Sequence, residues 1–444
     1  MTTLKGYQLL PHLPRIRTDT PGFLLECARR YGDWVHFDVG VTQAFFINHP
    51  DAVKHVLQEK NRYYTKDTLQ YRTLALVTGQ GLLTADGDMW LAHRRLLQPA
   101  FARPHLMALD EVVLPVVDRM LQRWEHLAIQ QEIVDVDHEM LEAALEVVGL
   151  ALFGLDLSRE APQLVRAVLT ALDYVIYRAQ NLVVPPLNWP TPRNRAFKRA
   201  LAELERAVDA ILDQRRDGKA QGGTLLNLLV QAEQAGQMTR QQVRDELVTM
   251  IVAGHETVAT ALTWTWYLLA QHPEVEATLL AEIDTVLDGR PPTREDLPKL
   301  TYSTQVFAEA LRLYPPAWLI TRRAIAEDAW MGHSIPRGAL IIISPYVLHR
   351  HPEFWDEPEA FHPERFAEDK ARAYPRFAYI PFGGGPRLCI GNQFALVEAQ
   401  LILSRVLQRF RLSFAGAGPV QAKPLVTLRP KGGMPMRLIP RQAS

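Results

Sequence analysis

The chain has 444 residues, of which 48% are apolar and 22% are charged; this balance excludes a disordered chain and predicts a globular protein with a large core. Its 49 basic residues equal its 49 acidic residues, so no overall field would attract nucleic acid or an acidic membrane surface. We therefore expect no nucleic-acid partner.

The N-terminal segment is interrupted by Pro11, Pro14 and Pro21 and has no apolar run long enough for a signal peptide or a membrane anchor. The sequence therefore predicts a cytoplasmic protein without an anchor. Cys27 lies among apolar residues in this segment, and we interpret it as a small buried residue. No linker, charge block or repeat divides the chain, so we predict one large domain over residues 1–444.

Apolar residues recur with a helical period over most of the chain, and Pro or Gly residues separate the periodic segments. The predicted helices are residues 51–59, 88–98, 110–128, 137–153, 161–180 and 192–216. The longest periodic segment, residues 242–271, would form a helix of about 45 Å. A helix of this length crosses a whole domain.

Segments typical of strands are shorter and fewer. They are WVHFDVG (34–40), AFFINH (44–49), ALIIISPYVLHR (339–350) and PLVTLRP (424–430). Strands and helices do not alternate regularly, which disfavours a Rossmann fold or a barrel. The predicted fold is mainly α with small β-sheets.

The long central segment has a polar middle. It is apolar enough to suggest a membrane span, but ionisable groups such as His255 and Glu256 are costly inside a membrane. These two residues also begin the H-E-x-x-H pattern of zinc proteases, which fails at Ala259. Gly254 removes a side chain, and the Thr257 hydroxyl can bend a helix. The segment is either a buried helix with a groove for a small molecule or a helix with an exposed polar stripe.

Glu309 and Arg312 are three residues apart, so they share one face of a helix that Pro315 and Pro316 end. Such a pair is usually exposed and contributes little to stability. The loop FHPERF supplies Arg365, which could link this loop to the helix. If the three side chains were buried, removing one would cost ~3–5 kcal/mol.

The second cysteine, Cys389, lies in the glycine-rich segment FGGGPRLCIG (382–391), directly before a segment with helical periodicity. Backbone N–H groups at a helix N-terminus stabilise a thiolate, and Arg387 adds a positive charge. The pattern therefore predicts a reactive or metal-ligating cysteine. Zinc would need further Cys or His residues nearby, and an iron–sulfur cluster usually needs four thiolates. A nucleophile with a remote histidine and a single axial ligand to haem iron both remain open.

Taken in order, these motifs resemble those of the cytochrome P-450 superfamily, the haem-thiolate monooxygenases, over essentially the full chain. The cysteine-loop pattern of that family, F-x-x-G-x-R-x-C-x-G, is met by Phe382, Gly385, Arg387, Cys389 and Gly391. Ahead of it stand the acid–Thr pair, the E-x-x-R pair and the P-E-R-F loop, in the family's order. The resemblance implies the P-450 fold, with the long central helix over haem b (iron protoporphyrin IX).

The resemblance also implies roles for individual residues. Cys389 would be the axial ligand of the haem iron, with Phe382 packed beside the sulfur. Trp90 and Arg94 resemble the family's W-x-x-x-R pair and would serve a haem propionate, and Arg322 competes with Arg323 for a similar role. The cofactor-binding residues implied are Cys389, Phe382, Arg387, Gly391, Trp90, Arg94 and Arg323. The structural triad implied is Glu309, Arg312 and Arg365.

At the oxygen site, the resemblance implies that Ala253 and Gly254 border the bound O2. Glu256 and Thr257 would relay protons to this site. Peroxide-using members of the family typically replace this acid–Thr pair by Arg-Pro, so the pair argues against an H2O2-dependent peroxygenase. That enzyme and a non-catalytic haem-thiolate sensor are the alternatives to a monooxygenase.

The substrate and the electron donor are implied only in outline. A small apolar organic substrate is expected, such as a carotenoid, a terpenoid or a fatty acid, because the central-helix and E-x-x-R segments resemble those of bacterial hydroxylases. Residues 71–83, 172–184, 317–320 and Val426 would line its pocket. Too few residues follow Cys389 for a flavin or iron–sulfur domain. We therefore expect electrons from a ferredoxin or flavodoxin with its NAD(P)H reductase.

Overall fold

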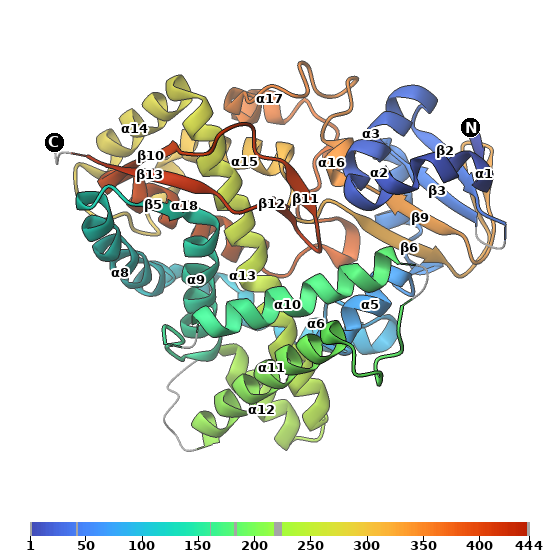
Figure 1. Cartoon of the computed structure of the whole chain (residues 1–444), viewed down its shortest axis with the longest axis horizontal. Helices are drawn as coiled ribbons and strands as arrows, with labels where there is room; N and C mark the ends of the chain where they lie inside the picture. The colour runs from blue at the N-terminus through green and yellow to red at the C-terminus, as the bar shows by residue number, and fades with distance from the viewer. Residues whose placement is uncertain (1, 41–42, 160, 182–183, 217–223, 442–444) are drawn as a thin grey trace.

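A computed structural model describes residues 2–40, 43–159, 161–181, 184–216 and 224–441. Helix α13 (Arg240–Gln271) runs through the middle of the molecule (Figure 1). Its first turn is fixed by a reciprocal cap: the Thr239 side chain accepts from the Gln242 N–H, and the Gln242 side chain accepts from the Thr239 N–H. This cap explains why the helix begins two residues before the predicted segment.

The other long helices surround α13. They are α5 (Leu69–Thr78), α6 (Gly87–Leu97), α8 (Asp110–Ile129), α9 (Val136–Val148), α10 (Ala161–Gln180), α11 (Pro192–Arg216), α12 (Thr224–Gln234), α14 (Pro273–Leu287), α15 (Thr301–Leu313) and α18 (Asn392–Arg409). Each predicted helix is confirmed to within two residues at both ends, although two of them finish in a wider turn. These turns are η2 (His55–Glu59), after α4 (Pro50–Lys54), and η5 (Gly149–Phe153), after α9.

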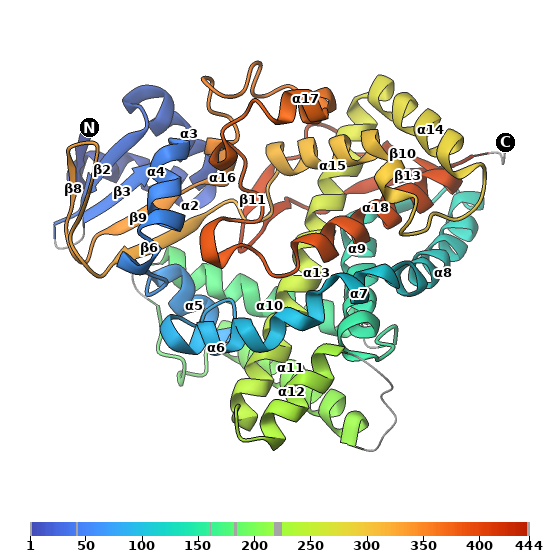
Figure 2. The same ribbon diagram turned by 180° about the vertical axis from the view of Figure 1, so that it is seen from behind.

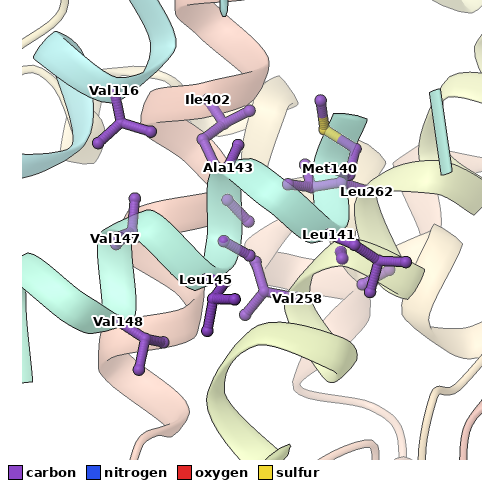
Figure 3. Packing of buried hydrophobic residues seen from close by; sticks show 14 of the residues in the cluster. Val116, Met140, Leu141, Ala143, Leu145, Val147, Val148, Val258, Leu262 and Ile402 are labelled. Atoms are coloured by element: carbon purple, nitrogen blue, oxygen red, sulfur yellow. The ribbon is translucent and has the colours of Figure 1, made fainter. Parts of the chain in front are cut away.

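Helix α9 packs along α13 through apolar side chains. Figure 3 shows Leu145 and Val148 of α9 in the same cluster as Val258 and Leu262 of α13, and all four are buried. A Cβ atom at Gly254 would lie 2.7 Å from a methyl carbon of Val148. The missing side chain at Gly254 therefore serves the close approach of α9, which differs from the groove inferred from the sequence.

The largest sheet lies at one side of the helices (Figure 1). Its strand order is β1 (Thr2–Lys5), β2 (Trp34–Asp38), β3 (Gln43–Ile47), β9 (Leu340–Ile343), β6 (Ile320–Ala324) and β4 (Tyr64–Thr65). Successive side chains alternate between its two faces. Phe45 and Ile47 pack into one apolar cluster, whereas Ala44 and Phe46 pack into another.

Two of the predicted strand segments are only partly strand. In residues 339–350, the strand ends before Ser344, whose side chain caps α16 (Pro345–Leu348) by accepting from the Val347 N–H. Residues 424–430 belong to a hairpin of β11 (Ala422–Pro424) and β12 (Leu428–Pro430), which places Thr427 beside α13. A turn within an apolar run explains both differences.

The remaining sheets are small. One has the order β10 (Phe410–Phe414), β13 (Pro435–Pro440) and β5 (Ile133–Asp135), and another pairs β7 (Asp328–Trp330) with β8 (His333–Ile335). Over the described ranges, no helix joins enough length to enough apolar character to cross a membrane.

Candidate active site

The loop that carries Cys389 is closed by its own backbone. The Cys389 N–H donates to the Phe382 carbonyl at 3.0 Å, and the Leu388 N–H donates to the Gly385 carbonyl at 3.1 Å. Gly383 and Gly385 have φ angles of +74° and +66°, which side chains rarely adopt. Helix α18 begins at Asn392, so Cys389 lies directly before a helix N-terminus, as the sequence indicates.

Gly385→Ala is expected to destabilise the protein more than Gly383→Ala. Both changes place a side chain at positive φ, which costs ~1–2 kcal/mol. A Cβ atom at Gly385 would also lie 1.9 Å from the carbonyl oxygen of Leu57 in η2, whereas a Cβ atom at Gly383 meets no atom within 4 Å. Urea unfolding of both variants measures the difference. Equal losses of unfolding free energy in the two variants would show that η2 can move away from the new side chain at no cost.

The side chain of Cys389 is exposed, and yet burial by the surrounding protein raises its pKa. The Gly391 N–H and the charge of Arg94 lower this pKa, but burial outweighs them. The sulfur is thus accessible although the protein around it removes much of its solvation. The cation that lowers the pKa of the sulfur is Arg94, whereas the sequence suggested Arg387.

A second accessible surface lies in the middle of α13. From Asp245 to Leu269, every residue of the helix is buried except Ala253, Gly254 and Thr257. These three lie on one helical face, since Ala253 and Gly254 are four and three residues before Thr257. The Thr257 hydroxyl donates to the Ala253 carbonyl at 2.9 Å. The accessible face of α13 therefore carries two small residues and one hydroxyl.

Glu256 lies next to Thr257 in sequence but points elsewhere. Its carboxylate is buried and accepts a 3.0 Å hydrogen bond from the Thr427 hydroxyl in the β11–β12 hairpin. Burial raises the pKa of Glu256 to about 7, although the charge of Arg429 and the Thr427 hydroxyl lower it. The structure thus separates the carboxylate from the accessible face, whereas the sequence suggested that the carboxylate and the hydroxyl act together.

Helix α6 brings Trp90 and Arg94 to the cysteine loop, which Figure 2 shows beside α6 and α18. Arg94 donates to the Leu388 carbonyl at 2.8 Å. The Arg387 guanidinium lies 4.2 Å from the Trp90 ring centroid, donates to the Ala85 carbonyl at 2.8 Å and pairs with Asp86. Loop and helix are therefore joined by cations that lie between them.

Arg322 and Arg323 project from opposite faces of β6 because side chains alternate along a strand. Arg323 is bonded to the carbonyls of Asp67 and Gly338 in an exposed position. Arg322 is buried, donates to the Tyr71 hydroxyl at 3.3 Å, and lowers the pKa of Arg387 by its charge. The structure therefore places Arg322, and not the Arg323 chosen from the sequence, near Arg387.

Glu309 and Arg312 are fully buried and form a bidentate pair, with N–O distances of 2.7 and 2.8 Å. Arg312 also donates to the carbonyls of His349, Pro358 and Ala360. The Arg365 side chain lies 3.4 Å from Glu309. The structure thus brings the three members of the predicted triad together, and all three side chains are buried.

Sequence reasoning missed His349. Its Nδ1 bonds the Arg312 carbonyl at 3.2 Å, and its Nε2 accepts from the Ile380 N–H at 2.9 Å. Since Nε2 accepts, Nδ1 carries the proton, and burial lowers the pKa of this neutral ring to about 3. His349 therefore connects the triad to the segment that leads into the cysteine loop. One histidine in an apolar run gives no sequence signal for such a contact.

An apolar cavity of about 400 Å³ opens between the large sheet, α5, α10 and the β11–β12 hairpin. All four segments predicted to line a substrate pocket contribute to it, and residues 182–183 of one segment lie outside the described residues. The contributing residues of these segments are Thr73, Leu74, Val175, Ile176, Ala179, Gln180, Trp318, Leu319 and Val426. The N-terminal helices α2 (Leu13–Thr18) and α3 (Thr20–Tyr31) line its outer part, which the sequence did not indicate.

These features fit a haem group. The accessible thiol of Cys389 can bind iron, and the accessible residues of α13 bring no large side chain that would obstruct a flat macrocycle. Arg387 lies near the charge of Arg322 and pairs with the carboxylate of Asp86, so these two cations leave positive charge for the acidic groups of a cofactor. Fold and site together define a haem-thiolate protein.

The chain belongs to the cytochrome P-450 family, whose family model matches residues 5–435. It is similar to the cyclooctat-9-en-7-ol 5-monooxygenase of Streptomyces melanosporofaciens, with 36% identity over 86% of this chain and 83% of the relative. It is similar to the pentalenene oxygenase of Streptomyces avermitilis, with 33% identity over 93% and 91% of the two chains. The solved structure of CYP175A1 from Thermus thermophilus matches with a TM-score of 0.80 and 32% identity, and the match covers 100% of both chains. The protein is an oxidoreductase of the monooxygenase class.

Proposed function

We propose that the protein inserts one oxygen atom of O2 into an elongated apolar terpenoid or carotenoid, using electrons from a separate ferredoxin or flavodoxin. The apolar cavity carries this proposal. No charged side chain is among its described lining residues. A fatty acid would bring a carboxylate that needs a cation, so the cavity favours a neutral hydrocarbon skeleton. The names of the two Streptomyces relatives support the same substrate class.

In this proposal, the cofactor is haem b. Cys389 would bind its iron as a thiolate, and Phe382 would lie beside the sulfur. Arg387 and Arg322, with Trp90 and Arg94 of α6, receive the cofactor's carboxylates, and Arg322 takes the role first expected of Arg323. When bound, the haem activates O2, and electron donation from the thiolate favours cleavage of the O–O bond.

The chain's own residues would manage protons and water. The Thr257 hydroxyl, on the accessible face of α13, donates its hydrogen to the Ala253 carbonyl. Its oxygen can therefore accept a hydrogen bond at the oxygen site, and rotation of the hydroxyl would let it donate there. Glu256 has a pKa of about 7, so it holds and releases a proton near neutral pH, and Thr427 keeps its carboxylate in place. Ala253 brings only a methyl group beside the hydroxyl, Gly254 lets α9 pack closely against α13, and the apolar walls exclude water.

Thr257→Ala is expected to bind haem normally but to release several-fold more H2O2 per NAD(P)H consumed, because the donor at the oxygen site is lost. Thr265→Ala is the matched control. Its hydroxyl makes the same bond to the carbonyl four residues earlier, Ala261, but it is buried away from the accessible face. Peroxide and product are measured per NAD(P)H. Equal coupling in both variants would contradict the role of Thr257.

The reaction class is tested by comparing two oxygen sources. A monooxygenase turns over with NAD(P)H, a ferredoxin or flavodoxin and the matching reductase. Turnover with H2O2 alone would indicate the alternative peroxygenase, and binding without turnover from either source would indicate a sensor.

The substrate class is tested by the spin-state shift of the haem on addition of carotenoids, terpenoids and fatty acids. We expect a shift with neutral long apolar compounds and a weaker one with fatty acids. A shift with fatty acids alone would overturn the argument from the uncharged cavity.

A further inference from the structure

Lys66 is a buried lysine in the segment between β4 and α5, with 8% of its surface exposed. Its ammonium group donates to the Leu83 carbonyl at 2.7 Å and lies 4.9 Å from the Tyr71 ring centroid. Buried lysines are rare unless an anion compensates their charge. One carbonyl oxygen and one aromatic face do not provide that anion.

Two arginines lie close to the same position. Arg322 donates to the hydroxyl of Tyr71, the ring that also faces Lys66. The charges of Arg322 and Arg387 both act on Lys66, and the carboxylate that opposes them is Asp86. Asp86 already has three partners, since it accepts the Lys66 backbone N–H at 2.5 Å and the Gly87 N–H at 3.0 Å and pairs with Arg387.

The charge balance at this position points to a ligand. Lys66, Arg322 and Arg387 carry three positive charges when protonated, and Asp86 carries one negative charge. Burying cations without counter-charges is unfavourable, so the cluster is suited to two further carboxylates. Haem b has two carboxylates, the propionates. The sign of the charges therefore matches, and Lys66 adds a further cation to the arginines already assigned to these groups.

We propose that Lys66 is a further cofactor-binding residue, whose ammonium group joins Arg322 and Arg387 in holding the two propionates. This inference rests on the proposed haem site. The sequence motifs give no role to Lys66, because its segment YTKD resembles an ordinary surface turn.

Proton uptake is a consequence of this arrangement. Burial, and then the charges of Arg322 and Arg387, hold the pKa of Lys66 well below its usual range, against the opposing effect of Asp86. A propionate beside the ammonium group raises this pKa again. Lys66 therefore gains a proton when the carboxylates bind, at any pH between the two pKa values.

The test compares haem with haem dimethyl ester, which lacks both carboxylates. The full chain is loaded with each, and the rate of transfer to excess apomyoglobin is measured for the wild type, Lys66→Met, Lys66→Arg and Arg323→Met. The last variant removes a cation from the opposite face of β6 and serves as the control. Because each protein is compared with itself, a general loss of stability cancels in the ratio of the two rates.

Lys66→Met is expected to lose haem about tenfold faster than the wild type, but to lose the ester at the wild-type rate, because only haem loses a charged hydrogen bond in this variant. Lys66→Arg is expected to restore most of the ratio, and Arg323→Met to leave it unchanged. An indicator dye in weak buffer should record proton uptake with haem and not with the ester. A wild-type ratio of rates in Lys66→Met, or equal proton uptake with both compounds, would overturn the proposal.

The reduced carbon monoxide spectrum separates this proposal from the proposed function. Lys66→Met loaded with haem should keep the thiolate-type spectrum of the wild type. If the role proposed for Lys66 is wrong, the wild type still shows the thiolate-type spectrum and the proposed haem site stands. If the wild type itself shows no such spectrum, the haem-thiolate proposal is wrong.

Discussion

Cys389→Ala is expected to abolish the red-shifted spectrum of the reduced, carbon monoxide-bound protein and with it all monooxygenase turnover. The sulfur is the soft ligand in a loop whose other residues, from Phe382 to Gly391, offer glycines, apolar side chains and Arg387. Alanine removes the sulfur but keeps the backbone bond from the residue 389 N–H to Phe382. The variant should therefore fold, and any haem that it binds should lack the thiolate signature.

The second cysteine provides a matched control. Cys27 is buried in α3 beside Phe23 and Leu24, and burial raises the pKa of its thiol to about 12. Cys27→Ala should therefore keep the thiolate spectrum and turnover. Difference spectroscopy of both variants decides the assignment. A thiolate spectrum in Cys389→Ala, or its loss in Cys27→Ala, would show that the ligand is misassigned.

Glu309→Ala is expected to lower the free energy of unfolding by ~3–5 kcal/mol, because it leaves two cations, Arg312 and Arg365, buried without their carboxylate. The His362 N–H, which donates to Glu309 at 2.9 Å, would lose its acceptor as well. Urea unfolding monitored by circular dichroism measures the loss. His349 links this network by hydrogen bonds to Ile380, which leads into the cysteine loop. The variant should therefore also retain haem poorly.

Helix α11 offers a control with the same spacing. Glu203 and Arg206 form an ion pair three residues apart, but Arg206 is exposed, with 71% of its side chain accessible. Glu203→Ala should therefore cost less than ~1 kcal/mol. Similar losses in Glu203→Ala and Glu309→Ala would mean that burial does not determine the strength of the Glu309 network.

The helical framework could be predicted from the sequence because apolar periodicity reports which face of a segment is buried. The predicted ends of α10 and α11 match the structure. The strand predictions were weaker: the hairpin of β11 and β12 reads as one short strand. A turn inside an apolar run leaves too few residues on each side to show a period.

The candidate site was predicted in its motifs and only partly in its contacts. The order of Glu256–Thr257, the E-x-x-R pair and the Cys389 loop predicted a haem-thiolate protein, and the family is confirmed. The structure places Arg322, and not Arg323, near Arg387, and a motif does not specify which face of β6 a side chain takes. The carboxylate of Glu256 points to Thr427, a residue 171 positions away, and no local pattern indicates that contact.

The sequence by itself determined the helices, the family and the cysteine at a helix N-terminus, because these depend on periodicity and on short-range spacing. Only the tertiary structure decided which charges are buried together. Lys66, Arg322 and Arg387 come from three distant segments, and His349 connects the Glu309 network to the cysteine loop. Burial turns such side chains from solvated surface groups into groups that need a partner, and burial is a property of the folded chain.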